Sequence, residues 1–344
     1  MAYTTINKST DYFNTKLISG NGGTQSITGV GHQPDFTWIK SRSRVDPHSL
    51  TDSVRGVASQ LDSSLTSAPT THSDAITSFD SDGFSLGSQA DVNRSGTTFA
   101  SWNWKANGAG SANTDGSVNS TVSVNTTAGF SIVSYTGNGN ATDTIGHGLG
   151  AVPKMIIVKK LSGVSTWNVY HQAIGNTGAL YLNTNDGTTT SSGFWNNTSP
   201  TSSVFTYNTT NPHIAYCFAE KTGYSKFGSY TGNGNADGTF IYTGFKPAFV
   251  MIKNTTNGNN WFISDNKRVP FNLADDSLFP NSNSAEMTTQ PTNYGLDILS
   301  NGMKMRTSGD HTVNNNNASS NTYIYMAFAE APLVGTNNVP CTAR

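Results

Sequence analysis

The chain has 344 residues, only 12% of them charged, and a formal net charge of −1 at pH 7. Such a neutral surface creates no long-range field that attracts nucleic acid or an anionic membrane, so we expect neither as a partner. No apolar run reaches the roughly 20 residues of a spanning helix, and Met1–Lys8 lacks the apolar segment of a signal peptide, so membrane insertion and secretion by a leader are not expected.

A sequence pattern near the start of the chain occurs twice more along it. It consists of Gly-Asn-Gly, a proline 12–14 positions after the second glycine, and a short apolar run ending in lysine. The copies lie at residues 13–42, 130–160 and 227–254. The last two contain the identical octapeptide Ser-Tyr-Thr-Gly-Asn-Gly-Asn-Ala. Internal repeats of this kind indicate one structural unit used three times.

Each copy also ends on a similar strand, at residues 100–104, 214–218 and 324–328. Its first, third and fifth positions are mostly large and apolar, and its second and fourth are mostly small. This period of two predicts a strand with one face filling a core and the other close against a neighbouring surface. Cys217 occupies a small position, so we expect a packing residue. With Cys341 as the only other cysteine, neither a disulfide framework nor a zinc site is expected.

Gly-Asn-Gly triplets and two dipeptides that end in glycine predict where the chain turns. The Gly-Asn-Gly triplets precede strand-like segments rather than helices, so we predict turns and not phosphate-binding loops. Asp82-Gly83 and Asn301-Gly302 are typical of two-residue type I′ hairpin turns.

These patterns predict an all-β fold of three tandem, related β-sandwiches, jelly-roll or immunoglobulin-like. The predicted organisation is a first unit over residues 1–107, a Gly/Ser/Asn/Thr-rich linker over 108–126, a second unit over 127–222, and a third over 223–344 that ends in an extended tail.

Residues able to do chemistry are few. Asp80 with Asp82, and Asp275 with Asp276, are paired carboxylates that we interpret as turn-forming, with weak calcium binding as the alternative. His32 and His147 precede the shared proline at different distances, so they do not define a common metal site. We expect no catalytic residues, no cofactor, no metal and no enzymatic activity; a polysaccharide-cleaving enzyme is the least favoured alternative.

Lysine closes the same apolar strand in all three copies, as Lys40, Lys159 and Lys253. We expect each to lie at the solvent end of a buried strand, with a ligand contact as the alternative. The residues proposed to bind a receptor are Trp195, Asn196 and Asn197. An indole stacks on a sugar ring while amides bind its hydroxyls, although the tryptophan is also suited to packing against its own sandwich.

Several long strings resemble uncharacterised, tail-fibre-like virion proteins of marine phages. They lie at residues 31–42, 78–87, 147–159 and 323–330. The resemblance implies a virion structural protein assembled in the host cytoplasm and exposed on the extracellular particle. It implies a tail fibre or adhesin that binds host-surface glycan, or a capsid decoration or head-fibre protein with a purely structural role. The implied partners are other tail or capsid proteins and further copies of the chain, with a trimer as one form. The short segment before the first unit would then attach to the virion.

Overall fold

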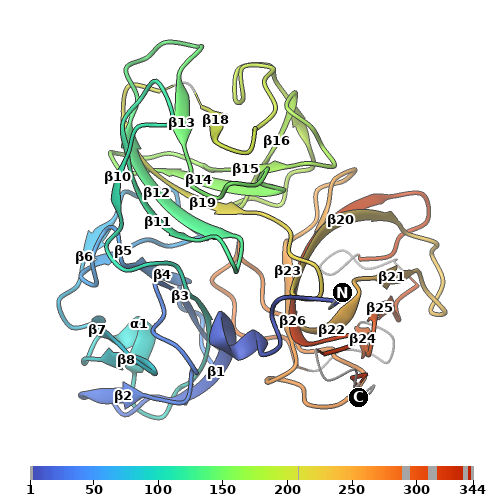
Figure 1. The fold of residues 1–344 in the computed structure, drawn as a ribbon. Helices are drawn as coiled ribbons and strands as arrows, with labels where there is room; N and C mark the ends of the chain where they lie inside the picture. Colours follow the sequence, from blue (N-terminus) through green and yellow to red (C-terminus); the bar gives the residue numbers. More distant parts are fainter. Residues whose placement is uncertain (1–2, 208, 289–294, 309–315, 336–339, 342–344) are drawn as a thin grey trace.

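Strands and turns make up nearly all of the protein in its computed structural model (Figure 1). The structure describes residues 3–207, 209–288, 295–308, 316–335 and 340–341. Helical segments within these ranges are one turn, η1 (Ser9–Asp11), and the short α1 (Ala90–Asn93). The predicted all-β class is therefore confirmed.

Three four-stranded segments share one strand order, in which the first strand of each repeat pairs with the last and every neighbour is antiparallel. The orders are β1-β9-β3-β4, β12-β19-β14-β15 and β20-β26-β22-β23. We call the corresponding thirds of the chain unit 1 (residues 3–107), unit 2 (108–222) and unit 3 (223–341). The strands are β1 (Phe13–Ser19), β3 (Phe36–Ser41), β4 (Ser49–Asp52), β9 (Thr98–Trp104), β12 (Phe130–Thr136), β14 (Met155–Lys160), β15 (Trp167–His171), β19 (Pro212–Phe218), β20 (Ser225–Thr231), β22 (Phe245–Asn254), β23 (Phe262–Asp265) and β26 (Thr322–Pro332).

A small second sheet packs on each large one and completes a sandwich. The orders are β2-β8-β7, β13-β18 and β21-β25-β24, and β5 pairs with β6 beside them. Apolar side chains of both sheets fill a separate sandwich core in each unit. The strands are β2 (Gln25–Ile27), β5 (Ser59–Gln60), β6 (Thr70–Thr71), β7 (Ile76–Asp80), β8 (Gly83–Leu86), β13 (Thr144–Gly146), β18 (Val204–Thr206), β21 (Phe240–Tyr242), β24 (Leu296–Leu299) and β25 (Gly302–Met305).

The predicted linker over residues 108–126 is wrong, because this segment forms two strands of unit 2. They are β10 (Ser111–Asn113) and β11 (Ser120–Asn125), and β11 pairs with the outer edge of β12. Strands β16 (Gly178–Tyr181) and β17 (Thr189–Thr190) extend the same sheet at its other end, to eight strands. Main-chain pairing holds the short β10 without any apolar periodicity, so its sequence resembles a linker.

The other faces of the three large sheets meet in one central core. Large side chains from all three units pack there, including Trp104 of unit 1, Phe218 of unit 2 and Phe328 of unit 3. Burying one such aromatic side chain contributes about 2–3 kcal/mol. Figure 1 shows the three units, coloured blue, green and orange-red, grouped around this centre.

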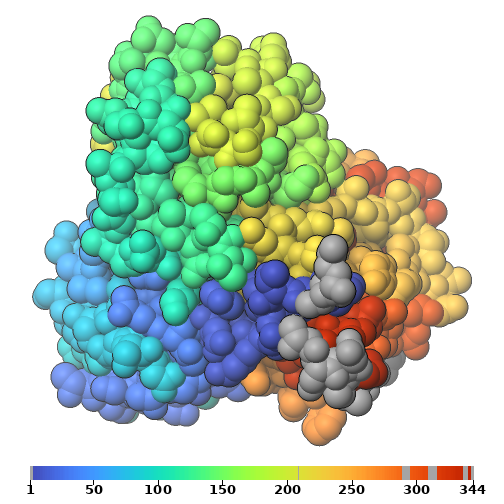
Figure 2. Space-filling view, viewed as in Figure 1, coloured from blue at the N-terminus to red at the C-terminus, as the bar shows by residue number. Residues whose placement is uncertain are grey.

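The start of the chain lies across a neighbouring unit. The Thr4 hydroxyl donates to the carbonyl oxygen of Thr222 at 2.7 Å, and the Tyr3 hydroxyl donates to that of Gly244 at 2.7 Å. In Figure 2 the blue N-terminal residues accordingly reach the orange-red part of the surface. Residues 336–339 and 342–344 of the predicted extended tail lie outside the described residues.

The alternation in the last strand of each repeat sorts side chains between the two kinds of core. Trp102, Tyr216 and Met326 occupy equivalent positions and face the central core. The small Cys217 and Ala327 face the sandwich cores of their units. Burial raises the pKa of the Cys217 thiol, so its predicted role as a small packing residue is confirmed.

The Gly-Asn-Gly triplets form turns, as predicted. Strands β1, β12 and β20 each end directly before the triplet, and its second glycine has a positive φ in every copy. In unit 3 the buried Asn317 holds the turn, because its amide donates to Asn233 Oδ1 at 2.8 Å and its own oxygen accepts from the Asn233 N–H. Asn93 makes the corresponding bonds to Asn21 in unit 1.

The two hairpins at the Asp-Gly and Asn-Gly pairs are present, but their turns start one residue earlier than predicted. In β7–β8 the pair Asp80 and Gly83 closes the turn, so Gly83 is the first residue of the returning strand. A Cβ atom on Gly83 would lie 1.9 Å from the carbonyl oxygen of Ile27, and one on Gly302 would lie 2.1 Å from that of Ile241. These glycines are therefore required by the close approach of a third strand.

Candidate functional site

Trp195, predicted to stack on a receptor sugar, lies inside the protein. Its side chain is 1% exposed, and its indole N–H donates to the carbonyl oxygen of Gly178 at 3.0 Å. Its ring meets Tyr170 edge-on with centroids 5.4 Å apart. Because the indole fills the sandwich core of unit 2 and its N–H is already bonded, it cannot meet a ligand, and the prediction is wrong for this residue.

Asn196 and Asn197 form the bend after the buried indole. Both have positive φ, at 48° and 50°, and Asn197 is exposed. The main-chain oxygen of Asn197 accepts a hydrogen bond from Asn176 at 2.8 Å. Receptor binding by these two amides stays a prediction, now without the aromatic platform on which it depended.

The three equivalent lysines are buried, so their expected position at the solvent ends of strands is wrong. The Lys159 ammonium of unit 2 donates to the carbonyl oxygen of Thr66 in unit 1 at 3.0 Å. Lys253 of unit 3 likewise donates to Asn185 of unit 2 at 2.8 Å, whereas Lys40 donates within its own loop to Ser41. Burial lowers the pKa of Lys40 and Lys159 to about 8 and that of Lys253 to about 7.

A low lysine pKa is a property of some nucleophiles, but all three side chains have zero exposed surface. Each ammonium already donates to two main-chain carbonyl oxygens. Two of the lysines thereby link neighbouring units by hydrogen bonds, and we assign them a structural role.

A ring N–H eight residues after each lysine makes a second set of contacts between units. Trp167 donates to the carbonyl oxygen of Asp62 in unit 1 at 3.0 Å, and Trp261 donates to that of Tyr181 in unit 2 at 2.9 Å. At the third position His48 Nε2 lies 2.9 Å from the carbonyl oxygen of Phe279 in unit 3.

The tautomer of His48 follows from its other ring nitrogen. The Trp38 indole donates to His48 Nδ1 at 2.8 Å, so Nε2 carries the proton and donates to unit 3. Burial lowers the pKa of His48 well below its usual value, which keeps the ring neutral. Trp167 thus joins unit 2 to unit 1, Trp261 joins unit 3 to unit 2, and His48 joins unit 1 to unit 3, so the three contacts close a ring. We call these three contact regions the seams.

Two buried carboxylates at the seams are each paired with an arginine and bonded across to the next unit. Asp52 of unit 1 accepts from Arg55 at 2.6 Å and from the Tyr216 hydroxyl of unit 2 at 2.7 Å. Asp265 of unit 3 accepts from Arg268 at 2.6 Å and from the Trp102 indole of unit 1 at 3.0 Å. Such fully bonded carboxylates have no free lone pair directed at a substrate.

The acidic pairs singled out in the sequence are also engaged. Asp82 accepts from the N–H groups of Gly29 at 2.9 Å and Gly31 at 2.7 Å, which lowers its pKa and supports its turn-forming role. Burial, with nearby Glu286, raises the pKa of Asp276 to about 6. Among the described residues no three His, Cys, Asp or Glu side chains are grouped to hold a metal ion.

Exposed aromatic rings gather instead on the outer face of the small sheet of unit 3. Ile241 in β21 is buried in the sandwich core, so its neighbours Phe240 and Tyr242 point outward, 45% and 53% exposed. Tyr3 lies beside them, because its hydroxyl reaches Gly244. Burial, followed by a hydrogen bond with Tyr242, raises the pKa of Tyr3 to about 12. We call these three rings the aromatic face.

Charged side chains border the aromatic face. Lys304 lies directly across from Phe240 in the sheet and pairs with Asp237, whose pKa this contact lowers. Arg306 bonds Asp297 at 3.3 Å, and both line a hollow of about 320 Å³. The face thus combines apolar rings with donors and acceptors at its margin, as small-ligand sites do.

The other two units have no such rings at the equivalent positions. With Ile27 aligned to Ile241, Ser26 and Thr28 of unit 1 replace the two rings. Thr144 and Gly146 replace them in unit 2, around Ile145. The signal in the sequence was Phe-Ile-Tyr, whose period of two places both rings on one face; only comparison of the copies marks it as specific to unit 3.

Residues 8–332 match the model of a protein family described as "Domain of unknown function (DUF7483)". No curated protein matches the chain, and no solved structure matches it. Among the described residues no helix has the length and apolar character needed to cross a membrane.

Proposed function

The chain belongs to the DUF7483 family, and from this premise we propose that it is a virion structural protein that binds host-surface glycan through the aromatic face. The virion part rests on the resemblance of its long sequence strings to tail-fibre-like phage proteins. The observation that carries the binding part is the outward exposure of Phe240 and Tyr242 side by side on one strand.

Sugar rings fit this arrangement chemically. The C–H face of a pyranose packs against an aromatic ring, and hydroxyl groups at its edge bond charged side chains such as Asp237 and Lys304. One such contact is weak, but many copies on one particle raise the effective affinity by roughly 10²- to 10⁴-fold. The net charge of −1 leaves both neutral and acidic polysaccharides as ligands.

The test compares two double variants on an array of bacterial surface polysaccharides. Phe240→Ala/Tyr242→Ala removes both rings, and Ser26→Ala/Thr28→Ala is the matched control on unit 1. Two stacking contacts at about 0.5–1.5 kcal/mol each predict a roughly 5- to 150-fold loss of affinity in the ring variant alone. Equal binding by both variants, or no binding by the wild type, contradicts the proposal.

A purely structural role, as a capsid decoration or head-fibre protein, is the second candidate. It is favoured by the closed ring of seams, which gives a rigid body, and by the burial of Trp195. Gold labelling of a tagged copy on intact particles separates the two, because a head location supports decoration and a tail location supports attachment.

A further inference from the structure

The outer edge of the large sheet differs between the three units. In each unit one edge of the first strand (β1, β12 or β20) pairs with the last strand of the repeat. The opposite edge, here called the outer edge, is the one that differs. Alternate residues of an antiparallel strand direct their N–H and C=O groups toward the free side. Unless other groups bond them, these N–H and C=O groups can pair with a strand of another chain.

In unit 2 another strand of the same chain covers this edge. Strand β11 pairs antiparallel with β12 over its whole length, with Ser123 opposite Ile132 and Thr121 opposite Ser134. Since Ile132 and Ser134 are equivalent to Thr15 and Leu17 of β1, this pairing shows the geometry in which the edge accepts a strand.

In unit 3 neighbouring groups bond the edge of β20. The Phe227 N–H donates to Glu220 at 3.3 Å, and the Phe227 oxygen accepts from Gln172 at 3.0 Å. The Ser225 N–H donates to the carbonyl oxygen of Lys221 at 2.9 Å, and the Thr231 oxygen accepts from Thr239 at 2.9 Å. A further strand would have to displace these contacts.

The edge of β1 is bonded only at its end, where the Ser19 carbonyl oxygen accepts from Gln25 at 3.3 Å; no strand covers the rest among the described residues. Tyr12 and Gly20 bond to the residues that flank β9, Lys105 and Thr97. Alternation between them makes Thr15 and Leu17 residues whose main-chain groups point away from β9. Within the described residues those groups have no hydrogen-bond partner. Thr15 as a whole residue is 2% exposed, with its hydroxyl unpaired among the described residues, whereas Leu17 is 44% exposed. A strand therefore reaches the main chain of Thr15 only when the side chain of Lys267, exposed in the same groove, moves.

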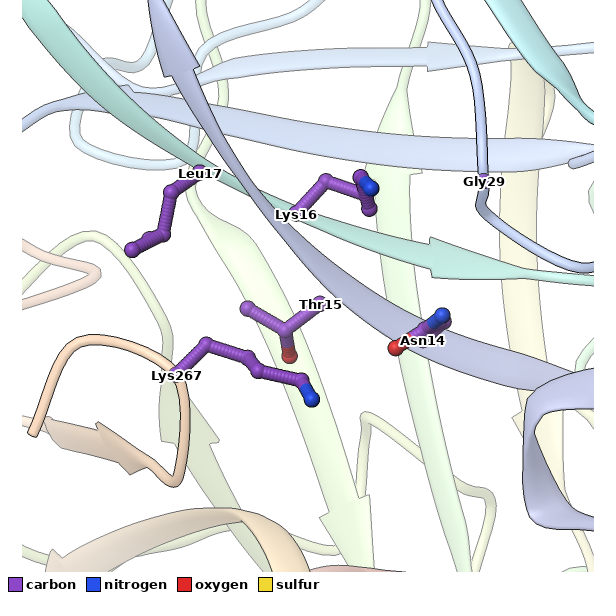
Figure 3. Close-up of a pocket in the computed structure, with 6 residues that line it drawn as sticks. All are labelled: Asn14, Thr15, Lys16, Leu17, Gly29 and Lys267. Carbon is purple, nitrogen blue, oxygen red and sulfur yellow. The ribbon is translucent and has the colours of Figure 1, made fainter. Parts of the chain in front are cut away.

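A groove of about 320 Å³ runs along this edge, as Figure 3 shows. Lys16 and Gly29 lie on one side of β1, and Thr15 and Lys267 lie on the other. Neither lysine forms an ion pair with a described residue, and no carboxylate lines the groove. An occupant with acidic side chains on both of its faces therefore complements the groove.

We propose that the β1 edge is a strand-acceptor site for an acidic, extended segment of another protein, which pairs antiparallel with β1 as β11 does with β12. Main-chain bonds to Thr15 and Leu17 supply the pairing, and neighbouring carboxylates on the segment meet Lys16 and Lys267. The inference does not depend on the proposed glycan binding, because it uses a different face and a different partner.

The test uses capped hexapeptides derived from β11 and the full-length protein. The acidic peptide Ser-Thr-Glu-Glu-Val-Asn is the sequence of β11 with its two central residues replaced by glutamate. In the register of unit 2 these glutamates lie opposite Lys16 and Thr15. The control peptide, Ser-Thr-Lys-Lys-Val-Asn, carries lysines at the same two positions. Amide resonances of Thr15 and Leu17 are followed by NMR during titration. We expect saturable shifts with the acidic peptide and at least fivefold weaker binding of the basic one. No shift at these two amides with the acidic peptide overturns the proposal.

Two variants test the geometry. Leu17→Pro removes an N–H that bonds no described residue, so we expect the fold to tolerate an edge proline there while peptide binding is lost; Leu17→Ala is the control. Lys16→Glu/Lys267→Glu reverses the charge, and we expect it to prefer the basic peptide. Undiminished binding by folded Leu17→Pro, or an unchanged preference in the charge-reversed protein, contradicts strand pairing. Concentration-dependent dimerisation abolished by Leu17→Pro would identify a second copy as the occupant and overturn the acidic partner.

Discussion

The seams and the outer surfaces of the three units follow opposite rules. At the seams one arrangement recurs, a buried lysine followed eight residues later by a ring N–H that crosses to the next unit. On the outer faces equivalent positions carry Ser26, Thr144 and Phe240. Buried geometry tolerates little change, whereas a solvent-facing strand accepts any side chain. The common architecture is therefore held at the seams, and specific binding is expected where the units differ.

The largest effect is expected from Trp104→Ala in the central core. The Trp104 ring stacks on Phe36 at 5.3 Å and meets Phe218 and Phe249 at 6.4 and 5.7 Å, so it touches all three units. Truncation should lower the free energy of unfolding by about 3–5 kcal/mol. Calorimetry should show one cooperative transition that moves as a whole, because the units share this core.

Trp195→Ala is the matched control, since this indole lies in the sandwich core of unit 2 alone. A comparable loss of stability is expected there, by the same truncation of a buried indole. Separate transitions for three units, with only one displaced by Trp104→Ala, would contradict the role assigned to the central core.

Breaking a seam ion pair should have the next largest effect. Arg268 is fully buried and donates to Asp265 at 2.6 Å and to Glu286 at 2.7 Å. Arg268→Met leaves the buried Asp265 without a cationic partner and leaves Glu286 paired with Arg42 alone, so it should cost about 3 kcal/mol. Urea unfolding measures the loss. The double variant Arg268→Met/Asp265→Asn should be less destabilised than the single one; equal or greater destabilisation would argue against charge as the cause.

Local patterns made the class of fold predictable, and partners distant in sequence made the rest unpredictable. Period-two alternation in Ala100–Trp104 indicated a strand with a large-residue face, yet it cannot say that this face meets two other units. The segment Ser111–Asn113 forms a strand through main-chain bonds alone, which leave no trace in side-chain pattern. Trp195 followed by two asparagines is typical of an exposed loop, and only the fold shows that the loop returns its indole to the core.

The buried asparagines offer a finer test of what the repeats share. Asn317→Ala removes the side chain that bonds Asn233 and leaves the carbonyl oxygens of Asn235 and Thr307 without its amide. Unsatisfied buried groups should reduce the free energy of unfolding by about 1–3 kcal/mol. The equivalent Asn93→Ala should cost a similar amount, as measured by urea titration. A neutral effect at both sites would mean that glycine conformation alone maintains these turns.

The smallest expected change in the free energy of unfolding is that caused by replacing Lys253, and it depends on pH. The pKa of Lys253 is about 7 in the folded protein, because burial lowers it from 10.5, so between these values the unfolded chain holds a proton that the folded chain lacks. Stability should therefore rise with pH through this window, and Lys40 and Lys159 should add to the rise from about pH 8.

Lys253→Met removes this contribution and also the bonds to the carbonyl oxygens of Asn185 and Asn259. Below pH 7 the variant loses the hydrogen bonds but gains by no longer burying an ammonium, so the two changes in stability oppose each other. The gain shrinks as the pH rises toward 10.5, where only the lost hydrogen bonds remain, at about 1–2 kcal/mol. Urea unfolding at pH 6.5 and pH 9.5 should thus show a gap between wild type and variant that widens with pH. The exposed Lys267→Met should give a constant gap, and a widening as large in that control would assign the pH dependence to the surface rather than to the seam.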